Sequence, residues 1–453
     1  MKVVKFGGSS LASGEQVEKV YQIVVSDSER KIVVVSAPGK RYADDTKVTD
    51  LLIDCATSYL HSGQASDLVE IIVKRYSCIA EELNLSETII NTIREDLLER
   101  LNGDKSSPER YLDCIKASGE DNNAKLIAAY FQHKGVEAYY VNPKEAGLLV
   151  SDEPGNAQVL AQSYERLYEL RERPGIVIFP GFFGYTESGE ILTFSRSGSD
   201  ITGSILANAI KADLYENFTD VDAVYSVNPN IVHNPKEIRE LTYREMRELS
   251  YAGFSVFHDE ALIPAFRAGI PVNVKNTNNP SAPGTRIVNE RSIKNGPVIG
   301  IASDKGFCSI YVSKYLMNRE IGFGRRLLQI LEQYGLSYEH IPSGIDDISI
   351  ILRQDQMNSE VEYEIVKRIK RELQADEVKV QRDLALIMVV GEGMRHNVGT
   401  TARAAKALAL AQVNIEMINQ GSSEVSMMFG VKEVVEKRAV QALYEEFFAR
   451  VLI

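Results

Sequence analysis

The chain has 453 residues, 44% of them hydrophobic and 25% charged, which is typical of a soluble globular protein and long enough for about three domains. Its formal net charge of −12 argues against a nucleic-acid-binding protein, which normally presents a basic face. No apolar run approaches the roughly 20 residues that a membrane-spanning helix needs, and the opening run MKVVKF lacks the pattern of a signal peptide. We therefore expect neither a membrane nor a nucleic acid as a partner.

The cysteines are few and scattered along the chain. They are Cys55, Cys78, Cys114 and Cys308. They form no CxxC pair and show no spacing typical of metal ligands. Free thiols in a reducing compartment are the simplest interpretation, so the sequence predicts a cytoplasmic protein without a protein-built metal site.

The first part of the chain alternates strand-like and helical patterns. Runs rich in β-branched residues predict strands at residues 3–6, 31–35, 136–141 and 175–179. Amphipathic patterns predict helices at residues 47–60, 67–83, 87–101 and 122–133. This alternation favours a largely parallel sheet covered on both faces. The helical stretch from about 47 to 116 is long for a crossover, so we expect it to form a subdomain over one edge of the sheet.

The pattern restarts on a smaller scale after the polar, Pro- and Gly-rich stretch at 276–284. A first copy predicts strands at 307–312, 336–341, 347–352 and 378–382, with helices at 321–334 and 360–373. A second copy predicts strands at 384–390, 414–419 and 425–431, with helices at 399–411 and 434–447. Two such βαββα(β) units are typical of small ligand-sensing or dimerisation domains.

A glycine turn follows the first strand, in the order Lys5-Phe6-Gly7-Gly8-Ser9-Ser10. Glycine N–H groups can line a phosphate-binding concavity, and a lysine at the strand end supplies charge for a polyphosphate. The Gly-Lys-Ser/Thr order of a Walker loop is absent. A tight strand-to-helix turn with a solvated lysine is the structural alternative.

Two further segments combine small and charged residues before expected helices. In SRSGSDITG (195–203), free N–H groups near the start of a helix at 201–211 favour an anion. There Arg196 is suited to a bidentate carboxylate contact, while Asp200 could be a plain N-cap. In SGED (118–121), expected at the start of a helix, the carboxylates could cap that helix or bind an ammonium group.

An acidic turn, NFTDVDAVY (217–225), follows another predicted strand. Such a turn could hold a ribose, an adenine edge or only its own backbone. Composition and spacing therefore stop at a phosphate-handling α/β enzyme.

Six motifs in order resemble the amino acid kinase superfamily and, within it, the aspartate kinase family very closely. They are KFGGSS (5–10), SAPGK (36–40) with KVTDLL (47–52), SGE (118–120), PGFFG (180–184), SRSGSD (195–200) and FTDVDAVY (218–225). Each motif is weak or moderate alone, but the resemblance covers essentially the whole chain.

The resemblance implies an α/β fold class: an amino acid kinase fold, with a mostly parallel central sheet between helices, followed by two ACT-type βαββαβ domains. The expected boundaries are residues 1–290 for the catalytic domain, 297–383 for the first ACT-type domain and 384–453 for the second. A strand at about 297–303 is a candidate to be shared with the second domain.

The implied activity is the ATP-dependent phosphorylation of the side-chain carboxylate of L-aspartate to 4-phospho-L-aspartate, the first step of lysine, threonine and methionine biosynthesis. ATP would act with Mg²⁺ held mainly by phosphates and water. No strong general base is required, because the aspartate carboxylate is already ionised at neutral pH.

The resemblance also implies roles for particular residues. Lys5 would stabilise the transferred phosphoryl group, and Asp200 would orient Lys5. The implied ATP-binding residues are Lys5, Gly7, Gly8, Ser9, Phe218, Thr219, Asp220, Tyr225 and Pro229. Arg196 would clamp an aspartate carboxylate, and Glu120 would pair with the ammonium group. The implied aspartate-binding residues are Ser36, Thr49, Glu120, Phe182, Arg196 and Ser199.

The sequence departs from many relatives at several positions. In the SRSGSD segment, Ser195 and Ser197 stand where many relatives have glycine. The two serines add side chains near the substrate. Asn230 and Ser255 stand where an arginine and a lysine are frequent, so two positive charges on the ATP side are missing. Lys275 is a candidate to compensate.

The first ACT-type unit is expected to bind an amino-acid effector. The implied effector residues are Met317, Gly322, Phe323, Ser337, Tyr338, Glu339, Asp346 and Asp347. The acidic groups among them suit the ammonium group of L-lysine, and aspartate kinases of this outline are commonly inhibited by lysine, with threonine as the main rival. The stretch 419–424 matches the family segment that helps pair ACT domains, so we expect a homodimer or homotetramer.

Two other interpretations remain open from the sequence. One is a kinase of the same fold that acts on glutamate, a carbamate or a nucleotide. The other is a catalytically weak amino-acid sensor, which only the missing charges at Asn230 and Ser255 favour.

Overall fold

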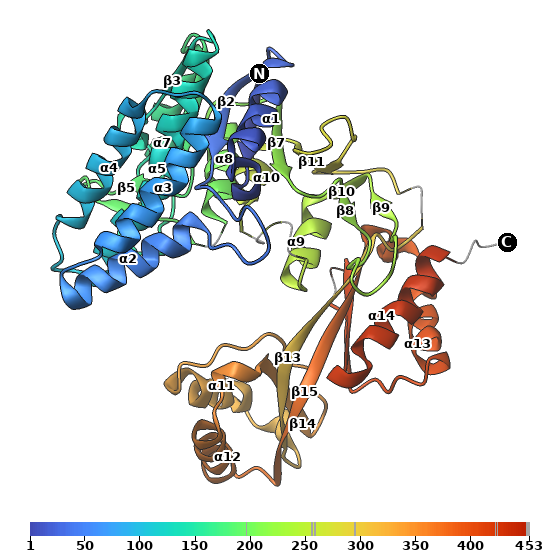
Figure 1. Ribbon diagram of the computed structural model, residues 1–453. Helices are drawn as coiled ribbons and strands as arrows, with labels where there is room; N and C mark the ends of the chain where they lie inside the picture. Colours follow the sequence, from blue (N-terminus) through green and yellow to red (C-terminus); the bar gives the residue numbers. More distant parts are fainter. Residues whose placement is uncertain are drawn as a thin grey trace. The chain divides into compact units, whose positions relative to one another are not determined.

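The computed structural model describes residues 1–195, 197–254, 257, 260–293, 296–421, 423 and 425–449. It divides into two compact units (Figure 1). Unit 1 comprises Met1–Val224, Glu237–Arg247 and Ser255–Arg291. Unit 2 comprises Tyr225–Lys236, Glu248–Phe254 and Ser292–Ile453. Two short stretches of the predicted catalytic domain, 225–236 and 248–254, therefore belong to unit 2.

An eight-stranded sheet forms the centre of unit 1. In spatial order its strands are β10 (Glu240–Thr242), β12 (Thr285–Val288), β11 (Val272–Asn276), β7 (Leu214–Thr219), β1 (Lys2–Phe6), β2 (Arg30–Val35), β4 (Ile176–Pro180) and β3 (Ala138–Tyr140). Every neighbouring pair is parallel except β11 and β12. The predicted α/β class with a largely parallel sheet is confirmed. Parallel strands covered on both faces are apolar along their length, which made them recognisable in the sequence.

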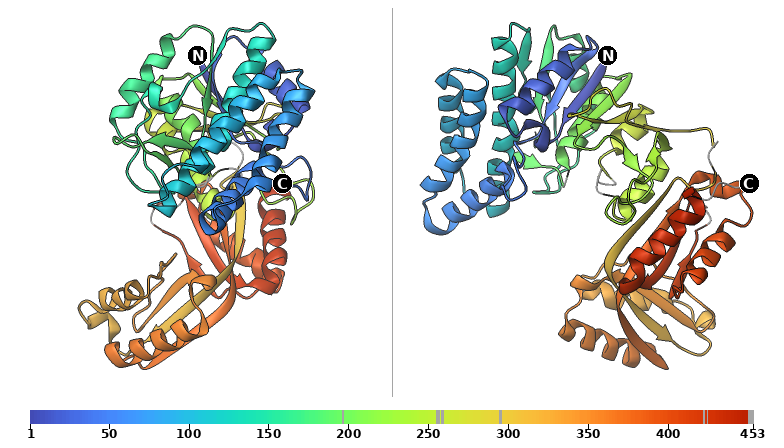
Figure 2. Two further views of the ribbon diagram at one scale, coloured as in Figure 1. Left: turned by 60° about the vertical axis from the view of Figure 1, so that its left-hand side comes forward. Right: turned by 45° about the vertical axis from the view of Figure 1, so that its right-hand side comes forward.

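Helices cover both faces of this sheet. The helices of unit 1 are α1 (Gly14–Val25), α2 (Val48–Ser62), α3 (Ser66–Glu82), α4 (Glu87–Leu101), α5 (Pro108–His133), α6 (Pro143–Ala146), α7 (Gln162–Leu167), α8 (Gly198–Ala209) and α10 (Ile263–Ala268). Helix α9 (Tyr243–Tyr251) begins in unit 1 and ends in unit 2. Short strand pairs are formed by β5 (Phe183–Tyr185) with β6 (Ile191–Thr193) and by β8 (Val224–Tyr225) with β9 (Glu237–Ile238). Helices α2, α3 and α4 pack with α5 at one side of unit 1 (Figure 2).

Helix α5 begins earlier than the sequence predicts. Its 26 residues start at Pro108, a favourable first helical residue, so the SGED segment lies in mid-helix and not at a helix start. A Cβ at position 119 would lie 2.9 Å from the Cβ of Ala37 and 3.0 Å from Leu52, which is too close for an unstrained contact. Glycine at this position avoids the clash. Its missing side chain lets α5 approach the segment after β2, and this tertiary contact outweighs the low helix propensity of glycine.

An antiparallel five-stranded sheet forms the centre of unit 2. In spatial order its strands are β14 (Asp347–Arg353), β13 (Gly300–Ser313), β15 (Glu377–Val390), β17 (Ser426–Lys432) and β16 (Met417–Asn419). Its helices are α11 (Phe323–Gln333), α12 (Ser359–Leu373), α13 (Thr400–Leu410) and α14 (Glu436–Tyr444). The strand predicted at 336–341 is not formed. That segment has one isolated bridge, from His340 to Ile351, and the N–H of Ser337 bonds the side chain of Gln356.

Strands β13 and β15 run through two separate hydrophobic cores. One core joins the second half of β13 with β14, α11 and α12, and the other joins β15 with β17, α13 and α14. The strands predicted at 378–382 and 384–390 are thus one strand, which passes Asp383 at a φ of 58°. The predicted boundary between 383 and 384 falls inside this continuous strand.

The lengths of the helices and the state of the cysteines bear on the expected class of protein. Within the described ranges, no helix is both long enough and apolar enough to cross a membrane. All four cysteines are free.

Candidate active site

The carboxyl ends of parallel strands meet at one edge of the unit 1 sheet. Phe6, near the end of β1, pairs with Val35 of β2 on one side and Phe218 of β7 on the other, and β4 ends beside β2 at Pro180. Ligands of open α/β sheets bind outside the carboxyl ends of the strands. The segments that follow β1, β2, β4 and β7 are the ones that the sequence motifs occupy.

A cavity of about 580 Å³ lies at this edge, within the usual size range of small-molecule sites. It gathers eight of the residues implied by the sequence: Gly7, Gly8, Ser9, Ser36, Thr49, Glu120, Thr219 and Asp220. These residues come from five separate segments of the chain.

The glycine turn after β1 packs directly against the segment after β2. The Gly7 N–H donates to the carbonyl of Phe218 at 3.1 Å, and the Gly39 N–H donates to the carbonyl of Gly8 at 2.8 Å. A Cβ on Gly39 would lie 2.5 Å from the backbone of Gly8, and one on Gly8 would lie 2.9 Å from the carbonyl oxygen of Ala37. Only glycines permit this approach, so the two segments form one wall of the cavity.

Lys5 forms a buried ion pair at the base of the site. Its Nζ lies 2.6 Å from Oδ1 of Asp200, and both side chains are about nine-tenths buried. Nδ2 of Asn217 donates to the same oxygen at 2.6 Å. Lys5 and Asn217 are register partners on β1 and β7, so their side chains share the sheet face on which α8 carries Asp200. The carboxylate therefore fixes the position of the ammonium group.

Glu120 carries a buried carboxylate without a full set of partners. Its residue is 5% exposed, and its Oε2 has no hydrogen-bond partner among the described residues. Burial raises the pKa of the Glu120 carboxyl to about 8, although a backbone hydrogen bond from Ala37 and the charges of Lys5 and Lys116 act in the opposite direction. An unpaired buried carboxylate in a ligand-sized cavity is suited to an ammonium group.

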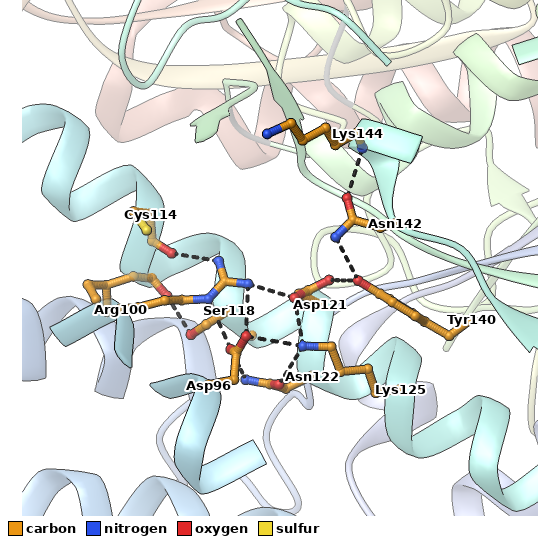
Figure 3. A network of polar contacts seen from close by, with 12 residues as sticks. Asp96, Arg100, Cys114, Ser118, Asp121, Asn122, Lys125, Tyr140, Asn142 and Lys144 are labelled. Carbon is orange, nitrogen blue, oxygen red and sulfur yellow. Dashed lines mark hydrogen bonds and ion pairs between the residues drawn. The ribbon is translucent and has the colours of Figure 1, made fainter. Parts of the chain in front are cut away.

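A network of charged side chains around Asp121, the residue that follows Glu120, fixes this part of α5 (Figure 3). The carboxylate of Asp121 lies 2.6 Å from Nη2 of Arg100 and 3.0 Å from Nζ of Lys125. Both cations also contact Asp96, at 2.9 and 3.1 Å, and the Tyr140 hydroxyl donates to Asp121. Two cations balance two carboxylates, so the network anchors α4, α5 and β3 together without adding net charge near the cavity.

Two segments that meet at the start of α8 each contain a residue with a strained backbone. Phe182 and Ser197 have positive φ values of 78° and 61°, a conformation that costs non-glycine residues about 1–3 kcal/mol and is often found at functional sites. The Phe182 N–H donates to Thr202 at 3.0 Å, and Ser199 packs so closely on Gly181 that a Cβ there would lie 2.6 Å away. Arg196 lies outside the described residues.

The other residues implied to bind ATP, Phe218, Tyr225 and Pro229, are not among those that line the cavity. The ring of Phe218 is fully buried and stacks on Phe6 at 4.9 Å, so its backbone carbonyl, not its ring, supports the glycine turn. Tyr225 and Pro229 belong to unit 2, and their role stays a prediction. Lys275, on β11, is not among the residues that line the cavity, and Ser255 lies outside the described residues.

Five of the implied effector residues gather where β13 ends and β14 begins: Met317, Gly322, Phe323, Asp346 and Asp347. Asp346 holds the turn between them, because its carboxylate accepts the N–H of Leu316 and its carbonyl accepts the N–H of Lys314, each at 2.8 Å. Helix α11 begins directly after Gly322, which has a φ of 77°.

The other three effector residues lie elsewhere in unit 2. Ser337 and Tyr338 line a cavity of about 900 Å³ together with Arg325. The carboxylate of Glu339 accepts a hydrogen bond from the Tyr251 hydroxyl. The eight residues therefore lie in two groups within this chain, and their role as one effector site stays a prediction.

Sequence reasoning gave no role to three cations that line the cavity. Lys40, Arg41 and Lys47 come from the loop between β2 and α2. The signal was present, since three basic residues fall within eight positions after a strand that ends at the site. Asn217 was also missed as a partner of Asp200. Within the described ranges, no group of three or more His, Cys, Asp or Glu side chains is placed to hold a metal ion.

Comparison with protein families finds two matches. The amino acid kinase family matches residues 1–276, and the ACT domain matches residues 387–447. The first match covers the whole of the cavity described above.

Individual relatives agree with these families. The chain is 74% identical to aspartokinase 3 of Bacillus subtilis (strain 168) over 453 residues, which is all of both chains. The crystal structure of Clostridium acetobutylicum aspartate kinase superimposes with a TM-score of 0.88 at 38% identity, over 99% of this chain and 100% of that one.

E. coli aspartokinase III is a more distant structural relative. Its complex with aspartate and ADP superimposes with a TM-score of 0.79 at 25% identity, over 99% of this chain and 100% of that one. Its complex with lysine and aspartate gives the same TM-score and identity, over 99% of each chain.

Proposed function

Because this chain belongs to the amino acid kinase family and is an aspartokinase, we propose that the cavity at the carboxyl edge of the unit 1 sheet is where it phosphorylates L-aspartate. The observation that carries this assignment is the convergence of eight motif residues on one cavity, next to the Lys5–Asp200 pair. The γ-phosphoryl group of ATP passes to the side-chain carboxylate, and the products are 4-phospho-L-aspartate and ADP.

The transfer needs positioning and charge stabilisation more than acid–base help. An ionised oxygen of aspartate attacks the γ-phosphorus, a new P–O bond forms, and the bond to the bridging oxygen of ADP breaks. Lys5 stabilises the charge on the transferred group, while Asp200 and Asn217 hold Lys5 in place. The backbone N–H groups of the glycine turn supply further donors.

The aspartate subsite is built around Glu120. Its buried carboxylate pairs with the substrate ammonium group, and Arg196 clamps a substrate carboxylate. Ser36 and Thr49 line the cavity beside Glu120, and Phe182 with Ser199 completes the pocket from the neighbouring segment. The complex of E. coli aspartokinase III with aspartate and ADP is in keeping with a site that holds both substrates.

ATP occupies the side of the cavity formed by the glycine turn, Thr219 and Asp220. Mg²⁺ would be held mainly by the phosphates and water, with few direct protein ligands. This fits the donors at hand, since the cavity lining offers Glu120 and Asp220 as its carboxylates and Glu120 is assigned to the ammonium group. The metal would supply positive charge that offsets the charge of the phosphates.

A coupled assay of ADP release tests this function. With MgATP, ADP should form with L-aspartate and not with L-glutamate, and Glu120→Ala should remove the aspartate-dependent rate. Equal rates with both amino acids would contradict the assignment and favour a different acceptor for the same fold.

We also propose that the enzyme catalyses the first step of lysine, threonine and methionine biosynthesis in the cytoplasm and is inhibited by L-lysine at the first ACT-type unit. The lysine complex of E. coli aspartokinase III supports this, as do Asp346 and Asp347 at the start of β14. Millimolar lysine should reduce aspartate phosphorylation, and Asp347→Asn should weaken that inhibition. An unchanged rate in the presence of lysine would contradict the proposal.

A homodimer or homotetramer formed through the ACT-type domains is part of the same proposal. The separation of the effector residues into two groups within one chain is consistent with a site that a second copy completes. Light scattering coupled to size-exclusion chromatography tests this, and a monomer under assay conditions would contradict it.

A further inference from the structure

The loop between β2 and α2 presents unpaired positive charge to the cavity. Lys40 and Lys47 line it and are exposed. Nζ of Lys40 reaches only the carbonyl of Ala43, at 3.3 Å, and among the described residues neither lysine pairs with a carboxylate. Exposed cations without partners at the mouth of a ligand-sized cavity are available to an anion.

The loop is held in a defined position from beneath. Asp45 is buried and accepts three hydrogen bonds from the backbone N–H and guanidinium of Arg41, at 2.8–3.0 Å. Arg75, buried on α3, donates to Asp45 at 2.8 Å and to the carbonyl of Gly39 at 2.6 Å. The Arg41 guanidinium beside it holds the pKa of the Asp45 carboxyl well below its usual range, so this clamp stays charged across the working pH range.

Without this loop, the site would have little positive charge available for a polyphosphate. The Lys5 ammonium is paired with Asp200 at 2.6 Å, and the cavity lining also includes two carboxylates, Glu120 and Asp220. A triphosphate would therefore enter a site in which the buried lysine is already neutralised. The cations that line the cavity, Lys40, Arg41 and Lys47, all lie in this loop, so within the described ranges the loop supplies the positive charge of the lining.

We propose that Lys40 and Lys47 bind phosphate oxygens of the nucleotide in this cavity, and that Asp45 and Arg75 are positioning residues that hold the loop against the glycine turn. This rests on the proposed function, because it assumes that the cavity binds ATP. The loop supplies the charge that the sequence lacks at Asn230 and Ser255.

The test is the KM for MgATP at saturating aspartate, measured at low and high potassium chloride. Lys40→Ala and Lys47→Ala should each raise this KM about tenfold, which corresponds to about 1.4 kcal/mol, because each removes a charge-assisted contact to a phosphate oxygen. The KM for aspartate should change little. The KM for MgATP should also depend less on salt than in the wild type, because salt screens exposed charges. Lys40→Arg should restore most of the affinity.

Lys74→Ala is the matched control. Lys74 is exposed on α3 next to Arg75, carries the same charge, and does not line the cavity. It should leave both KM values and their salt dependence unchanged. If Lys40→Ala and Lys47→Ala behave like this control, or if they raise the KM for aspartate instead, the proposal is overturned. Absence of aspartate-dependent ADP release in the wild type would instead refute the proposed function.

The positioning role has its own readout. Asp45→Asn should raise the KM for MgATP in the wild-type background and add little once both lysines are alanine, because it acts through them. Circular dichroism of each variant identifies a folding defect. An equal effect of Asp45→Asn in both backgrounds would show that the clamp serves the fold and not the lysines.

Discussion

Replacing Glu120 by glutamine should stabilise the free enzyme while it removes aspartate binding. The carboxyl has an ordinary pKa of 4.5 and burial raises it to about 8 in the folded protein. At pH 7 the unfolded carboxyl is ionised and the folded one is mostly protonated, so at 1.36 kcal/mol per pKa unit folding costs about 3 kcal/mol more than with a side chain that stays neutral. Glutamine keeps the shape and carries no charge, so this cost disappears.

The pH dependence gives the sign of the effect. Because the folded pKa lies above the unfolded one, the cost is absent below pH 4.5, grows between 4.5 and about 8, and is complete above that range. The urea-unfolding midpoint of Glu120→Gln, followed by circular dichroism without aspartate, should thus match the wild type near pH 4.5 and exceed it increasingly as the pH rises.

Kinetics and a control complete this experiment. The KM for aspartate should rise about 100-fold in Glu120→Gln, because truncating one partner of a buried charge pair costs about 2–5 kcal/mol. Glu169→Gln, at an exposed position, should change neither stability nor KM. A stability difference that is independent of pH, or a Glu120→Gln protein less stable than the wild type at pH 8, would refute the reasoning.

Three other predictions follow from the geometry of the site and of the helices. Aspartate binding should release up to one proton at pH 7, because the pKa of Glu120 is raised to about 8 and the group must ionise to pair with the ammonium group. Calorimetry in buffers of different ionisation enthalpy measures this release, and Glu120→Gln should abolish it. Asn217→Ala should lower kcat about tenfold with little change in either KM, because Asp200 loses a hydrogen bond that orients Lys5; a changed KM for ATP alone would argue against this role. Gly119→Ala should lower the melting temperature, because its Cβ would lie 2.9 Å from Ala37, and this clash outweighs the gain of about 1 kcal/mol in helix propensity. Gly324→Ala in α11 has open space around it and should raise the melting temperature.

Much of the fold was predictable because its strands carry strong local signals. The buried parallel strand β2 ends in the β-branched run IVVV and β1 contains Val3 and Val4, and the ends of these strands mark where the site forms. The errors arose where tertiary contacts override local signals. Gly119 and its polar neighbours indicated a helix start, yet close packing on Ala37 places them inside α5. Two strands were predicted at 378–382 and 384–390, yet β15 is one strand that passes through Asp383 in a left-handed conformation.

The motif residues that line the cavity were predicted from the sequence, but the lysines that line it were not. The motif residues after β1, β2 and β7 converge because parallel strands end at one edge, a consequence of topology that the strand pattern implies. The roles of Lys40 and Lys47 depend instead on how their loop folds back onto the glycine turn through Gly39 and on the buried partner Arg75. That partner lies on α3, and nothing in the local sequence connects it with the loop.

The most direct test of the central claim is to trap the acyl phosphate as its hydroxamate. Wild-type enzyme with MgATP, L-aspartate and hydroxylamine should form aspartyl hydroxamate. Lys5→Ala should lose at least about 100-fold in rate, while Lys2→Ala, on the same strand and paired with Asp27 at 2.6 Å, should retain activity. Formation of hydroxamate at the same rate by Lys5→Ala, or none by the wild type, would contradict the account.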